Sequence, residues 1–227
     1  MTVTDAEINA LVEYCEAHLG DPNLWTTPVG YPNSLALCII DSIYSTGSHY
    51  SSVVNVIERY TALRGTRDGA KTLAQSIQHA GGAREWATSI AHNLKPAHTG
   101  PGAPLKAEII EQAAELMSKL GIDTVPDLVS QVNDSPLDNE VLRGWKRLPS
   151  QSSGVTYNYL LILAGLPSVK PDRMVLRFLA QALGEESELD GARAVKLITE
   201  TAKSMNVDPR ALDHIAWRAA SGRELID

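Results

Sequence analysis

The segment that decides the fold reads LPSQSSGVTYNYLLILAGLPSVKPDRMVLRFL and spans residues 148–179. A serine-rich turn opens it, and an apolar run long enough for one helix follows. Asp172 then precedes apolar residues at helical spacing. Because an aspartate side chain accepts hydrogen bonds from the free N–H groups of a first helical turn, Asp172 is expected to begin a second helix. The segment therefore predicts two helices joined by a loop, with a carboxylate at the start of the second.

Helical periodicity extends over the rest of the chain. Apolar residues recur three and four positions apart in 8–15 and again in 109–120. Stretches rich in Gly and Pro separate such segments, and no run shows the sustained alternation of a strand. We therefore predict an all-α protein with about ten or eleven helices.

The composition is that of a globular protein, large enough for one domain or two lobes. The 227 residues are 44% hydrophobic, and no apolar run approaches the roughly 20 residues needed to cross a bilayer. The first residues lack the basic and apolar pattern of a secretory signal. We therefore expect a cytoplasmic protein without a membrane partner.

The sequence shows no set of residues at the spacing that metal or cofactor ligands require. Cys15 and Cys38 lie in apolar helical patterns, which favours buried thiols over a disulfide. Two cysteines cannot supply the four thiolates of an iron–sulfur cluster, and the six histidines form no ligand-spaced pair. No metal and no cofactor are predicted.

Three blocks of the chain resemble the helix-hairpin-helix DNA glycosylases of the endonuclease III type. The leucine-proline turn, apolar helix and proline-preceded aspartate of 148–179 carry most of the resemblance, and 32–60 and 105–128 match two earlier blocks in the same order. The resemblance implies a two-lobed fold in which DNA and a flipped base meet the cleft between the lobes. It implies a central lobe over 32–135 and a second lobe formed by 1–31 and 136–227.

The resemblance implies that Asp172 is the catalytic carboxylate. A glycosylase must extrude its target nucleotide, because the N-glycosidic bond is inaccessible inside the stack. Departure of the base leaves positive charge on the sugar, which a fixed carboxylate stabilises while it orients or deprotonates the attacking water. The alternative is an ordinary helix-capping aspartate, since the two roles use the same sequence position.

The hairpin differs from the family pattern at two places. Bifunctional members carry a lysine 18 residues before the aspartate, where this chain has Gly154, and Lys170 is the only lysine between Leu148 and Asp172. A Schiff base is therefore not expected, which predicts a monofunctional enzyme. The family's leucine-proline-glycine-x-glycine becomes Leu-Pro-Ser-Gln-Ser, and added Cβ atoms make close approach to a phosphate harder.

Basic charge is concentrated around this segment. The whole chain carries a net charge of −7, whereas residues 141–180 hold six basic residues against Asp172 alone. Such a cluster favours DNA phosphates, with a chance group of solvated side chains as the alternative. The predicted DNA-binding residues are Ser150, Gln151, Ser152, Ser153, Gly154, Lys146, Arg147, Lys170, Arg173 and Arg177.

Four further residues are candidates for the base pocket. Tyr44 lies at the turn where the family places a side chain that fills the hole left by the flipped base. Asp41 interrupts an apolar run and offers a hydrogen-bonding group, while Tyr157 and Asn158 follow the hairpin. A core tyrosine and an exposed helix carboxylate are the alternatives for Tyr44 and Asp41.

Two classes of function follow. The first is a monomeric, monofunctional DNA glycosylase that excises a damaged or modified base, in repair or in defence against modified foreign DNA. The second is a noncatalytic helical module that binds DNA or protein on the same scaffold, which the acidic total and the serine-substituted hairpin favour. A third and lower option is a different all-α enzyme.

Overall fold

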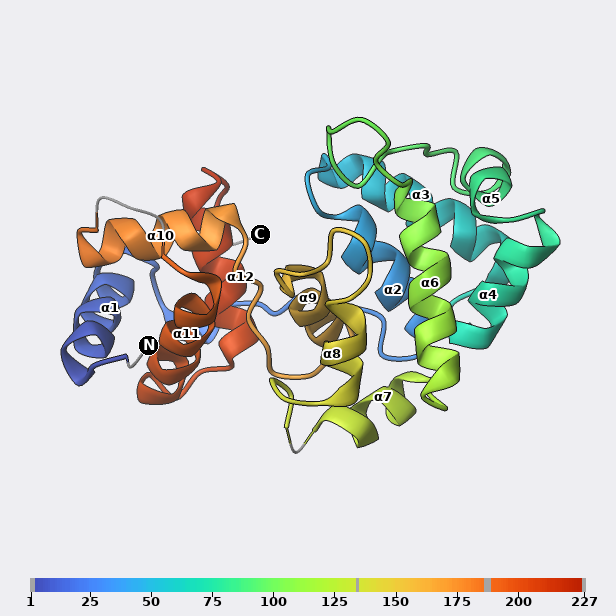
Figure 1. The fold of residues 1–227 in the computed structure, drawn as a ribbon. Helices are drawn as coiled ribbons and strands as arrows, with labels where there is room; N and C mark the ends of the chain where they lie inside the picture. Colours follow the sequence, from blue (N-terminus) through green and yellow to red (C-terminus); the bar gives the residue numbers. More distant parts are fainter. Residues whose placement is uncertain (1–2, 134, 186–188, 226–227) are drawn as a thin grey trace. The chain divides into compact units, whose positions relative to one another are not determined.

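The computed structural model describes residues 3–133, 135–185 and 189–225, and its regular structure there is helical (Figure 1). The all-α prediction is confirmed: these ranges contain no strand, only an isolated bridge between Pro96 and Leu105. Among them no helix combines the length and apolar character needed to span a membrane. The elements are α1 (Asp5–His18), η1 (Pro22–Leu24), α2 (Leu35–Tyr44), α3 (Tyr50–Arg64), α4 (Ala70–His79), α5 (Ala83–Ser89), α6 (Lys106–Lys119), α7 (Val125–Val132), α8 (Glu140–Trp145), α9 (Val155–Leu163), α10 (Arg173–Leu183), α11 (Gly191–Ser204) and α12 (Pro209–Ala220).

The described chain divides into two compact units, each with its own hydrophobic core. Unit 1 combines Met1–Val29 with Pro167–Asp227, and unit 2 is Gly30–Leu166. The division differs from the expected lobes, which placed 136–166 with the chain ends. The reason is that α9 packs against α2 and α8 packs against α6, so the hairpin segment buries its apolar side in unit 2.

Unit 2 is built around α2, a helix with no exposed face. All ten of its residues are buried, and α3, α4, α6 and α9 pack around it (Figure 1). The sequence LALCIIDSIY explains this placement, because a helix that is apolar on every side must be covered on every side. Ser34 caps its first turn by accepting a hydrogen bond from the N–H of Leu37 at 3.2 Å.

Lys106 satisfies the other end of α2 from inside the core. Its side chain is 2% exposed, and Nζ donates to the carbonyl oxygens of Ile43 at 3.0 Å, Tyr44 at 2.9 Å and Thr46. The last carbonyls of a helix have no partner within the helix, and a cation at this end interacts favourably with the helix dipole. The ammonium therefore compensates its burial by capping the helix on which unit 2 is assembled.

Substitution of Lys106 by Met should destabilise the protein by about 2–4 kcal/mol, because several buried carbonyl groups lose their donor. Urea unfolding followed by circular dichroism measures this change. Lys119→Met is the matched control on the same helix, since Lys119 is 76% exposed and pairs only loosely with Glu115 at 3.8 Å. Equal midpoints for the two variants would contradict the capping role of Lys106.

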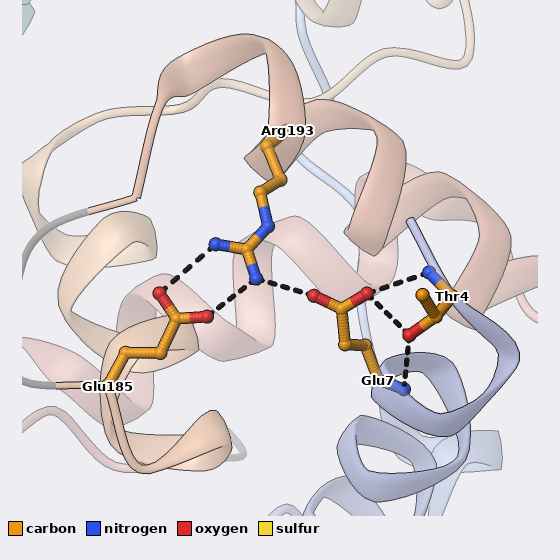
Figure 2. Close-up of polar contacts among 4 residues, drawn as sticks. All are labelled: Thr4, Glu7, Glu185 and Arg193. Atoms are coloured by element: carbon orange, nitrogen blue, oxygen red, sulfur yellow. Dashed lines mark hydrogen bonds and ion pairs between the residues drawn. The ribbon is translucent and has the colours of Figure 1, made fainter. Parts of the chain in front are cut away.

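Unit 1 joins the two ends of the chain. Here α1 packs against α10 and α11, and α12 packs against both of these helices. Arg193 of α11 connects α1 to the residue Glu185, which follows α10, as Figure 2 shows. Its Nη2 lies 2.5 Å from Glu7 Oε1 of α1 and 2.6 Å from Glu185 Oε1. Glu7 Oε2 also accepts hydrogen bonds from the N–H and hydroxyl of Thr4, which complete a capping box at the start of α1. The hydrogen bonds from Thr4 and from Arg193 lower the pKa of Glu7 to about 2.

Arg193→Met should lower the unfolding free energy by about 1–3 kcal/mol near neutral pH, because two carboxylates lose a charged donor. The contribution of Glu7 is complete above its usual pKa of 4.5 and is lost as the pH falls toward 2. Stability of the wild type should therefore fall more steeply between pH 4.5 and pH 2 than that of the variant. Denaturant titrations across this range test both expectations, with Lys196→Met, an exposed position of α11, as control. If the unfolding free energies of the wild type and the variant fall equally between pH 4.5 and pH 2, the role assigned to the Arg193–Glu7 pair is contradicted.

Candidate active site

Asp172 lies at the N-cap of α10, as the sequence predicts. Its Oδ1 accepts hydrogen bonds from the N–H groups of Met174 at 2.9 Å and Val175 at 3.2 Å. Within the described part of the chain, Oδ2 accepts no hydrogen bond, and the side chain is only partly buried. A tight turn precedes the helix, in which the N–H of Asp172 donates to the carbonyl of Lys170 at 2.7 Å. The carboxylate is thus held through one oxygen and offers the other.

A second carboxyl group lies beside this turn. Asp213 of α12 is 6% exposed, and its Oδ1 accepts the N–H of Lys170 at 3.0 Å. Burial raises the pKa of Asp213 well above its usual value, and the charge of Asp172 raises it further, while the interactions with Lys170 oppose both effects. Asp213 is not among the residues that the sequence pattern predicts for the site. The available signal was an acidic residue between Leu212 and Ile215 on the buried side of an amphipathic helix.

The hairpin of unit 2 is a compact turn between α8 and α9. The N–H of Gln151 donates to the carbonyl of Leu148 at 3.1 Å, and the N–H of Gly154 donates to the carbonyl of Gln151 at 3.0 Å. Ser150 has φ +62° and Gly154 has φ +77°, both in the left-handed region. A residue with a Cβ adopts this conformation at a cost of roughly 1–2 kcal/mol, so the hairpin imposes on Ser150 a backbone that suits glycine.

The Gln151 side chain faces the protein interior. It is 4% exposed, its Oε1 accepts a hydrogen bond from the Thr156 hydroxyl, and its Nε2 donates to the carbonyl of Pro149 at 3.2 Å. Trp145 Nε1 donates to the same Thr156 hydroxyl at 2.8 Å. Gln151 therefore stabilises the hairpin internally, in contrast to its predicted contact with DNA, and Ser150, Ser152 and Ser153 are the exposed side chains of the turn.

The predicted pocket residues are buried in unit 2. The Tyr44 side chain is fully buried, and its hydroxyl donates to the carbonyl of Asn93 at 3.0 Å. A stacking role for Tyr44 does not fit this position, because the ring has no exposed surface; the core alternative describes it. Asp41 is also buried and accepts a hydrogen bond from the Tyr31 hydroxyl at 2.8 Å, which contradicts the alternative of an exposed helix carboxylate.

Tyr157 and Asn158 lie on the first turns of α9, and both are buried. The Tyr157 hydroxyl donates to the carbonyl of Pro136 at 2.9 Å and accepts a hydrogen bond from Asn139 Nδ2 at 2.9 Å. Burial raises the pKa of Tyr157 to about 12. These bonds fix the segment before α8 to α9, so Tyr157 has a structural role in unit 2.

The predicted basic residues fall into two groups, one in each unit. Lys146 and Arg147 are exposed directly before the hairpin in unit 2. In unit 1, Arg173 and Arg177 are exposed one turn apart on α10, next to Asp172, and Lys170 is partly buried. Each group accompanies one of the two predicted elements, the hairpin or the catalytic aspartate.

No group of three or more His, Cys, Asp or Glu side chains is arranged to hold a metal ion within the described ranges. Cys15 and Cys38 are both free and buried, as their apolar surroundings predicted. Burial raises the pKa of the Cys15 thiol to about 12, which makes it an inert packing group.

The described part of the chain is thus all-α and forms two compact units. Unit 1 carries the capping aspartate, and unit 2 carries the serine-substituted hairpin. Residues 9–221 match the model of a family described as a domain of unknown function, DUF8548, and the chain belongs to this family. No curated protein and no solved structure matches the chain.

Proposed function

We propose that this protein is a monofunctional DNA glycosylase of the helix-hairpin-helix type, with Asp172 as its catalytic carboxylate. The observation that carries the proposal is the position of Asp172 at the N-terminus of α10, where two backbone N–H groups hold Oδ1 and leave Oδ2 available. The hairpin adds support, because Ser150 keeps a left-handed backbone where the resembling family has glycine. In this proposal the two units are the two lobes of the glycosylase fold.

The chemistry assigned to Asp172 is hydrolysis. The bond between the flipped base and the sugar breaks, and its electron pair leaves with the base. Water then forms the new bond to the anomeric carbon and gives up a proton, which Oδ2 of Asp172 accepts. This proton passes through solvent to the departed base, which leaves the base neutral and restores the Asp172 carboxylate. Negative charge at this position also stabilises the positive sugar of the transition state, and the N-terminus of α10 favours an anionic side chain there. The products are a free base and an abasic site.

Asp172→Asn should reduce product formation by about 10²–10⁴-fold, because the amide neither accepts a proton nor carries charge. The fold should be unaffected, since asparagine caps a helix as well as aspartate does. The assay incubates the protein with DNAs that contain uracil, oxidised, alkylated or hypermodified bases and counts strand breaks after alkali treatment. Asp190→Asn is the matched control, because Asp190 caps α11 in the same unit by accepting the N–H of Arg193 at 3.3 Å.

Each outcome of this assay has a distinct meaning. Alkali-dependent breaks that disappear in Asp172→Asn and persist in Asp190→Asn support the proposal and identify the excised base. Breaks without alkali would contradict the monofunctional assignment. Breaks that persist at wild-type level in Asp172→Asn would remove Asp172 from the chemistry.

Lys146→Ala combined with Arg147→Ala should weaken DNA binding and lower the salt dependence of the binding constant. Each lost phosphate contact reduces the slope of log K against log salt by about 0.9. Fluorescence anisotropy at several salt concentrations measures this slope, with Lys119→Ala as an exposed control in the same unit. An unchanged slope would remove the 146–147 pair from the DNA interface.

The second candidate is a noncatalytic helical module that binds DNA or protein. The observation in its favour is the hairpin itself, where the exposed Ser150, Ser152 and Ser153 put side chains at the surface that would meet a phosphate. DNA affinity without abasic product on any substrate, and with no effect of Asp172→Asn, would favour this module over the enzyme.

A further inference from the structure

We propose that Asp213 is the positioning residue of the site: its buried carboxyl on α12 holds the Lys170 N–H and thereby sets the orientation of the turn that presents Asp172. This inference rests on the proposed function and adds to it a residue that the resemblance does not assign. The contact that carries it is the 3.0 Å hydrogen bond from the Lys170 N–H to Asp213 Oδ1.

Two hydrogen bonds of the Lys170 backbone connect Asp213 to Asp172. The N–H of Lys170 is held by Asp213, and the carbonyl of the same residue accepts the N–H of Asp172 at 2.7 Å. Pro171, which lies between them, is buried and has a restricted φ. Both sides of the Lys170 backbone are therefore fixed, and the start of α10 is fixed to α12, against which α10 packs.

Burial of a carboxyl group costs free energy, and one hydrogen bond from a backbone N–H offsets only part of this cost. Asp213 is 6% exposed, and its helix also contributes Leu212 and Ile215 to the hydrophobic core of unit 1. An aspartate is almost never buried to this extent unless it is paired, so packing alone does not account for an acid here. A role in the geometry of the site does account for it.

The two carboxyl groups also have different environments. Asp172 is partly exposed and accepts two N–H groups, whereas Asp213 is buried beside it. Burial and the neighbouring charge of Asp172 raise the pKa of Asp213, which favours its neutral form. A protonated Asp213 still accepts the Lys170 N–H through its carbonyl oxygen and adds no negative charge next to Asp172.

Two variants of the full chain separate this role from simple packing. Asp213→Asn keeps a neutral carbonyl acceptor of the same shape, and its kcat should stay within about 3-fold of the wild type. Asp213→Leu keeps the branched shape in a larger side chain and removes the acceptor, and its kcat should fall by roughly 10–100-fold, because small misplacements of a catalytic group reduce rates by such factors. KM should change little in both variants, since the hydrogen bond lies behind the aspartate.

Hydrogen exchange of the Lys170 amide, followed by NMR, tests the anchor independently of activity. Exchange should be slow in the wild type and in Asp213→Asn and faster at this amide in Asp213→Leu, whose unfolding midpoint should fall because the Lys170 N–H loses its acceptor. If the leucine variant keeps its kcat although the Lys170 amide exchanges freely, the positioning role is overturned and the glycosylase proposal stands. An equal loss of kcat in both variants also overturns it, because the acceptor is then not the relevant feature.

Failure of the proposed function gives a different result. In that case the wild-type protein releases no base from any DNA, and the catalytic part of this inference fails with it. Slow exchange of the Lys170 amide in the wild type and in Asp213→Asn alone would then show a structural anchor for the α10 N-terminus.

Discussion

Unit 2 depends on one constraint, which is that α2 has no face that water can solvate. Ten buried residues in succession require helices on all sides, and α3, α4, α6 and α9 meet this requirement. Polar groups buried with α2 are hydrogen-bonded inside the unit. Asp41 accepts a hydrogen bond from Tyr31, and Lys106 donates to the carbonyl groups at the end of α2. Because α9 is one of the covering helices, the hairpin that precedes it belongs to this unit.

Unit 1 solves a different problem, since its helices come from opposite ends of the chain. The amphipathic α1 has no neighbour in sequence to cover it and is buried by α10 and α11. Arg193 makes the arrangement specific, because one guanidinium satisfies carboxylates that are separated by most of the sequence. The candidate aspartate thus stands on a helix whose packing requires the N-terminal residues.

The two aspartates of unit 1 show how environment separates the roles of identical side chains. Asp172 is supported by the N–H groups of a helix start and remains partly exposed, whereas Asp213 is buried and accepts the N–H of Lys170. Asp172 has the access to solvent that the proposed hydrolysis needs, and Asp213 holds the Lys170 backbone from a buried position. The proposed division of labour follows from this asymmetry.

The sequence by itself determined the features that depend on local chemistry: the helical class, the free buried thiols and the capping position of Asp172. These follow from periodicity and from the needs of a helix end, which involve residues a few positions apart. Only the tertiary structure decided that 136–166 packs in unit 2, that Tyr44 and Gln151 face inward, and that Asp213 meets Lys170. Each of these depends on a contact between segments distant in sequence, or on which face of a segment is covered, and amphipathic patterns alone do not identify the partner that covers it.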